Sequence, residues 1–69
     1  MEFQLNGQEY IQLNDLLKVL SLVGTGGEAK IRILEGEVFL NGEVCQVIRK
    51  KLREGDVVQL GEMEILISA

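Results

Sequence analysis

Few residues could act as nucleophiles, and the sequence contains nothing to activate them. The chain has one cysteine, Cys45, and several hydroxyl side chains, but it has no histidine to serve as a general base. No pair of acids stands out from the eleven Asp and Glu as an acid–base pair. A single cysteine without histidine also cannot supply the ligands of a usual zinc site. The sequence therefore predicts a protein that is not an enzyme and that uses no metal and no cofactor.

The basic residues are concentrated in one part of the chain, where they could bind the phosphates of a polyanion. Six of the seven Lys and Arg lie between residues 30 and 53 with only three acids, although the whole chain has a net charge of −4. This distribution predicts a basic patch on an otherwise acidic body, which would direct a nucleic acid to one face. The alternative is that these charges only solvate the surface.

The candidate binding residues fall in two groups. Two consecutive glycines at a helix start would leave backbone N–H groups bare for a phosphate, with a lysine one turn further on. A run of three basic residues could converge on one ligand if it forms a loop. No aromatic residue lies within the basic stretch, so the sequence does not predict base stacking on single strands. We predict that the following residues contact the phosphates of a nucleic acid: Lys30, Arg49, Lys50, Lys51, Arg53, Arg32, Gly26 and Gly27.

The clearest element that could position these residues is a helix at about residues 26–35. Thr25 followed by Glu28 forms a capping box, in which the hydroxyl and the carboxylate each accept a hydrogen bond from a backbone N–H. Gly36 falls where a helix ends in a left-handed residue. Both boundaries of this helix are therefore predicted by local chemistry.

A second helix is predicted upstream, at about residues 12–22. Its apolar residues recur at helical spacing and would form one buried stripe. Gly24 is expected to end it. Because the link to the next helix is short, the two should pack together. The stripe consists of Leu13, Leu16, Leu17 and Leu20.

Three hairpins are predicted around turn-forming dipeptides. Asn6-Gly7 would join strands in residues 3–10, and Asn41-Gly42 would join residues 37–40 to 43–47. Gly61-Glu62 would join residues 57–60 to 63–67. The fold class expected is α+β, with two packed helices against one side of a small, mostly antiparallel sheet.

At 69 residues the chain is expected to form a single domain, 1–69. It contains no apolar run near the length of a membrane span and no signal-peptide pattern. We therefore expect a cytoplasmic protein with no membrane partner. We also expect it to be a monomer and to have no small-molecule substrate.

The sequence resembles the α-L RNA-binding domain family, first described in ribosomal protein S-four. The resemblance covers roughly residues 11–60. Within it, the Gly-Gly-x-Ala-Lys opening of the second helix is most similar to that of the small stand-alone bacterial members, the YbcJ-like group. The motif residues, in the family's order and at about its spacing, are Leu13, Asp15, Leu16, Leu17, Glu28, Ala29, Lys30, Ile33, Gly36, Val38, Leu40, Asn41, Gly42, Gly55, Asp56 and Val57.

The resemblance implies that the helix pair and the adjoining loop bind structured RNA, such as ribosomal RNA or the ribosome, without chemistry of their own. Two basic positions of the wider family are not basic here. Gly26-Gly27 replaces an arginine at the start of the second helix, and Gln12 replaces a basic residue at the start of the first. Two phosphate contacts of the family are therefore absent.

Two alternatives from other classes remain open. The alternation of strands around a leucine-rich helix is also similar to β-grasp sulfur-carrier proteins, but the sequence ends in Ser68-Ala69 where those carriers have Gly-Gly. The second helix would also be an unexplained insertion in that fold. The other alternative is a protein-interaction module that docks through an exposed strand such as residues 63–67.

Overall fold

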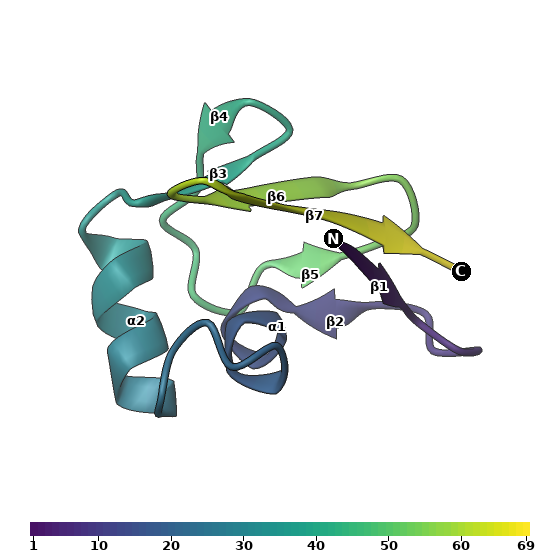
Figure 1. Cartoon of the computed structure of the whole chain (residues 1–69), viewed down its shortest axis with the longest axis horizontal. Helices are drawn as coiled ribbons and strands as arrows, with labels where there is room; N and C mark the ends of the chain where they lie inside the picture. Colours follow the sequence, from purple (N-terminus) through teal and green to yellow (C-terminus); the bar gives the residue numbers. More distant parts are fainter.

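The computed structural model describes all 69 residues, which form two helices and seven strands (Figure 1). Five strands form one sheet in the order β1-β7-β6-β3-β4, and the other two form a separate ribbon, β2-β5. The β1–β7 pair is parallel, and all other pairs are antiparallel. The elements are β1 (Glu2–Gln4), β2 (Ile11–Gln12), α1 (Leu13–Val19), α2 (Gly26–Leu34), β3 (Val38–Leu40), β4 (Glu43–Val44), β5 (Lys51–Leu52), β6 (Val57–Leu60) and β7 (Met63–Ser68).

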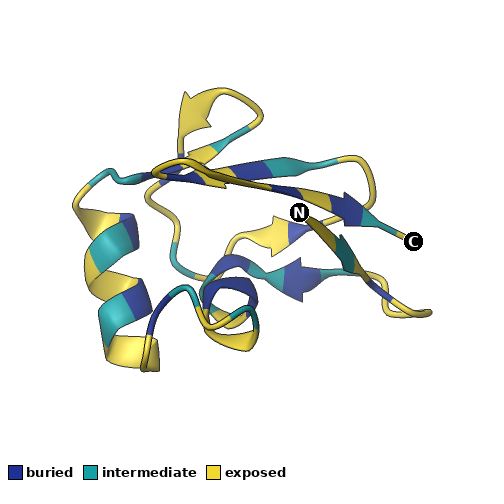
Figure 2. Cartoon of the chain, in the orientation of Figure 1, coloured by how far each residue is buried: buried dark blue, intermediate teal, exposed yellow.

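The helices and the β2–β5 ribbon lie on one side of the five-stranded sheet, and no helix lies on the other side (Figure 1). The core fills the space between these layers, as the dark blue segments of Figure 2 show. It consists of 15 buried residues, all of them apolar, and no polar or charged residue is buried. Neither helix has the length and apolar character needed to cross a membrane. The predicted α+β class is therefore confirmed.

Helix α2 has the boundaries that the sequence predicts. The Thr25 hydroxyl accepts a hydrogen bond from the Glu28 N–H at 3.1 Å, as the capping box requires. The helix ends before Gly36, whose φ of 79° is in the left-handed region that glycine adopts without steric cost. Ala29 and Ile33 form its buried face.

Helix α1 is shorter than predicted, and the expectation that Gly24 ends it is wrong. The helix ends at Val19, and Ser21 takes a left-handed conformation with φ of 58°. The Leu22 N–H donates to the Leu17 carbonyl at 3.0 Å and closes the last turn. The sequence gives no sign of this boundary because a serine occupies the position where glycine is usual.

The predicted N-terminal hairpin is wrong, although its turn is present. Asn6 and Gly7 both have positive φ, 52° and 88°. However, β1 pairs in parallel with β7, with Phe3 opposite Ile67, and β2 pairs with β5 instead. The dipeptide sets only the local backbone, and here the turn leads the chain from the sheet into the second layer.

The other two hairpins are confirmed. Strands β3 and β4 pair around Asn41-Gly42, and β6 and β7 pair around residues 61–62. Strand β4 ends at Val44, three residues earlier than predicted. Beyond it, the Gln46 side chain donates to the Leu34 carbonyl at 2.9 Å, which ties the chain to the C-terminal end of α2.

Candidate functional site

The basic segment, residues 48–53, is held against the N-terminal end of α1. The first two N–H groups of this helix, those of Leu13 and Asn14, donate to the carbonyls of Lys50 at 2.9 Å and Ile48 at 3.1 Å. These bonds satisfy helix donors that no side chain caps, since Gln12 makes no capping bond. The backbone of the basic segment is thus the cap of α1, and its position is fixed by the helix.

Arg49 and Lys50 project from a tight turn. The Lys50 N–H donates to the Val47 carbonyl at 3.2 Å, and both basic side chains are exposed without an ion pair. Lys51 follows as the first residue of β5 and is also exposed, while Leu52 is fully buried. The run is therefore part turn and part strand.

An aromatic residue lies beside this segment, which the sequence does not reveal. The Lys51 Nζ lies 4.9 Å from the centroid of the Tyr10 ring, and the Arg53 Cζ lies 5.7 Å from it. Both distances suit a cation–π contact. Arg53 also pairs with Glu9 at 3.0 Å. Tyr10 is placed there by the β2–β5 pairing, which joins residues about forty positions apart in sequence and leaves no local signal.

The Asn-Gly and Gly-Asp motifs meet at the far end of the basic segment. The Asp56 carboxylate accepts from the Arg53 N–H at 2.8 Å and from the Asn41 Nδ2 at 3.1 Å. The Asn41 Oδ1 in turn accepts from the Val57 N–H at 2.9 Å. These residues therefore act structurally, since they fix the end of the basic segment to the β3–β4 hairpin.

Helix α2 contributes an exposed lysine and two glycines with bare N–H groups. Lys30 makes no ion pair. It lies four residues before Leu34, whose carbonyl binds the Gln46 side chain, and this is roughly 6 Å along the helix axis. The Gly26 and Gly27 N–H groups have no partner in the chain, but they start the helix, roughly 12 Å before Leu34. The glycines therefore lie at the end of α2 opposite to the one that Gln46 contacts.

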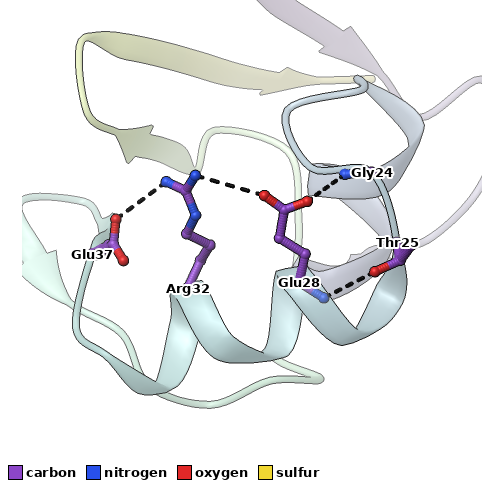
Figure 3. Close-up of polar contacts among 5 residues, drawn as sticks. All are labelled: Gly24, Thr25, Glu28, Arg32 and Glu37. Carbon is purple, nitrogen blue, oxygen red and sulfur yellow. Dashed lines mark hydrogen bonds and ion pairs between the residues drawn. The ribbon is translucent and has the colours of Figure 1, made fainter.

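Arg32 is already engaged within the chain (Figure 3). Its guanidinium lies 3.2 Å from Glu37 and 3.6 Å from Glu28. The other Glu28 oxygen accepts from the Gly24 N–H at 2.8 Å, so one line of polar contacts runs from the start of α2 past its end. A phosphate at Arg32 would compete with two carboxylates. Glu28 would likewise weaken the attraction of the helix N-terminus for an anion.

Five basic side chains remain without an ion pair, and all lie in the helical layer, which comprises α1, α2, the basic segment and the β2–β5 ribbon. We refer to these five exposed side chains as the cationic surface. No group of three Cys, Asp or Glu residues comes together in a way that could hold a metal ion. The arrangement offers exposed cations to a polyanion. The unpaired cations are Lys18, Lys30, Arg49, Lys50 and Lys51.

The fold and this surface define an S4 domain protein. The family model for the S4 domain matches residues 3–68, and the chain belongs to this family. Among solved structures, the chain is similar to YbcJ from E. coli, with a TM-score of 0.75 and 32% sequence identity over 99% of this chain and 86% of that one. The solution structure of YbcJ is described as revealing an α-L motif involved in RNA binding. No protein of curated function matches the sequence. The resemblance to the α-L family is thus confirmed, and the sulfur-carrier alternative is not favoured.

Proposed function

We propose that this protein binds structured RNA through the helical layer, with Lys30, Arg49, Lys50 and Lys51 as its phosphate contacts. The observation that carries the proposal is the turn that caps α1 and presents Arg49 and Lys50 unpaired to solvent. Membership of the S4 domain family and the likeness to YbcJ, whose motif is described as RNA-binding, support it. The protein acts as a binding module and catalyses no reaction.

The contacts available favour recognition of RNA shape over base sequence. Lysine and arginine side chains on phosphates position an RNA without identifying its bases. Tyr10, the aromatic residue of this surface, has two cations within 6 Å of its ring and so provides no open platform for a base. Folded RNA holds its phosphates at fixed spacings, and it therefore suits cations that project from fixed backbone positions better than a flexible strand does.

The proposal assigns secondary roles to the other predicted residues. Arg53 and Arg32 have intramolecular partners, so they hold the surface in shape and contact phosphate only when those pairs open. Gly26 and Gly27 form a second, weaker contact point at the start of α2. The RNA we propose is ribosomal RNA or another structured cytoplasmic RNA, bound by a monomer.

The test is to let the protein retain RNA from a total RNA preparation at graded salt and to sequence what remains bound. A folded RNA should survive washing at moderate salt, and an unstructured RNA of equal length should be lost first. Equal retention of both would contradict shape recognition. No retention even at low salt would contradict RNA binding itself and would show that the acidic body outweighs the basic surface.

A further inference from the structure

The two layers of the molecule differ in charge. The five-stranded sheet and its β6–β7 turn contain no Lys or Arg, and their acids are Glu2, Glu43, Glu62 and Glu64. The rest of the chain holds all seven basic residues and seven acids, so it has no net charge. The net charge of −4 therefore belongs to the sheet and its β6–β7 turn. The pairing register places Glu2 and Glu64 on the face away from the helices, whereas Glu43 lies opposite Leu40 on the other face.

The uncovered face of this sheet has an apolar centre. The pairing register places Val44, Phe39, Gln59 and Glu64 in one row across four strands. A second row runs through Val57 on β6, Leu66 on β7 and Glu2 on β1. No helix covers these rows (Figure 1), and the exposed segments of β6 and β7 are visible in Figure 2.

The exposed apolar area on this face is substantial for so small a domain. Val44 is 50% exposed, Leu66 42% and Phe39 38%, although each lies within a paired strand. Leu66 has an acid on either side of it, Glu2 on β1 and Glu64 two residues earlier on β7. The α-amino group of Met1 donates to the Glu64 carbonyl at this edge and offsets only part of the negative charge. Grouped apolar residues with polar neighbours are typical of protein interaction surfaces.

We propose that the uncovered sheet face, formed by Val44, Phe39, Gln59, Glu64, Val57, Leu66 and Glu2, docks a basic polypeptide segment that carries apolar side chains. The apolar centre would bury such side chains, and the flanking carboxylates would attract lysine or arginine. A second copy of the chain is a poorer occupant because two such faces would bring carboxylates together. RNA is repelled by the same acids. The protein would then join an RNA on one side to a basic protein on the other.

The experiment titrates the isotope-labelled full chain with a short synthetic peptide in which lysine and valine alternate. The proposal expects saturable changes in the amide NMR signals of Phe39, Gln59 and Leu66. The matched peptide with glutamate in place of lysine should leave these signals unchanged. The double variant E2K/E64K, which keeps every buried residue, should weaken binding of the lysine peptide by about tenfold. Leu66→Ser should weaken it independently of charge.

Three results would overturn the proposal. The first is unchanged affinity in both E2K/E64K and Leu66→Ser while their spectra show a folded chain. The second is an equal response of acids on the helical layer, such as Glu9 and Asp15, which would indicate attraction to any carboxylate. The third is dimerisation of the wild-type chain by sedimentation that Leu66→Ser abolishes, which would make a second copy the occupant. RNA binding is measured separately, so failure of either proposal leaves the other standing.

Discussion

The turn that caps α1 gives the sharpest prediction for RNA binding. Replacing Arg49 and Lys50 by alanine removes two exposed cations that make no ion pair. The carbonyl of Lys50 that accepts from Leu13 belongs to the backbone and is kept. The double variant should therefore fold normally and bind RNA more weakly.

The size of the loss follows from counterion release. With the four proposed phosphate contacts and roughly 0.8 counterions released for each, the slope of log K against log salt should be about −3.2. Loss of two contacts should reduce the slope to about −1.6, and at about 0.1 M salt it should weaken binding roughly 40-fold. Both quantities come from one series of binding titrations of a folded RNA at increasing salt.

The matched control changes net charge by the same amount on the other layer. Gln4 and Gln59 are exposed on strands of the sheet, and Q4E/Q59E adds two negative charges without touching the cationic surface. This control should keep a slope near that of the wild type. The reasoning is refuted if R49A/K50A keeps the wild-type slope, or if the control loses as much affinity, because net charge alone would then decide binding.

Three further predictions concern the elements that shape the surface. Ser21→Gly should stabilise the domain by about 0.5–1 kcal/mol in urea unfolding, because glycine adopts the left-handed conformation of residue 21 without steric strain. Ser21→Ala should not stabilise it, and a glycine variant less stable than the wild type would contradict this reasoning. Asn41→Ala should lower the free energy of unfolding by about 2–3 kcal/mol, since it loses both side-chain hydrogen bonds and places alanine at φ of 51°. Asn41→Gly should have an intermediate effect, because glycine tolerates this φ. A loss of stability below about 0.5 kcal/mol in Asn41→Ala would refute the structural role of Asn41. Tyr10→Leu should weaken RNA binding by about two- to fivefold in a binding titration, because the Tyr10 ring positions Lys51 and Arg53. Tyr10→Phe keeps the ring and should not weaken binding. Equal losses in the two variants would exclude the cation–π role.

Local chemistry predicted much of this fold correctly. The capping box at Thr25 and the glycine at position 36 define α2, and Asn41-Gly42 closes the β3–β4 hairpin, because in each case a few neighbouring residues determine the backbone. Ser21 marks the limit of this approach. Its left-handed conformation ends α1, but nothing in the type of residue shows it.

Pairings between distant segments could not be predicted in the same way. Phe3 lies opposite Ile67, and Ile11 lies opposite Leu52. Burial of apolar side chains in a shared core selects these partners, and the turn at Asn6-Gly7 does not. The basic residues are visible in the sequence. The contacts of Tyr10 and the ion pairs of Arg32 depend on the folded structure and appear only in three dimensions.

A folded RNA bound to the helical layer would leave its contact surface in the amide NMR spectrum of the protein. An isotope-labelled sample would be titrated with a folded RNA at low salt while the amide signals of every residue are followed. We expect the largest changes at Lys30 and residues 49–51, smaller ones at Gly26 and Gly27, and almost none on β6 and β7. Changes confined to the sheet, or no change at any residue, would contradict it.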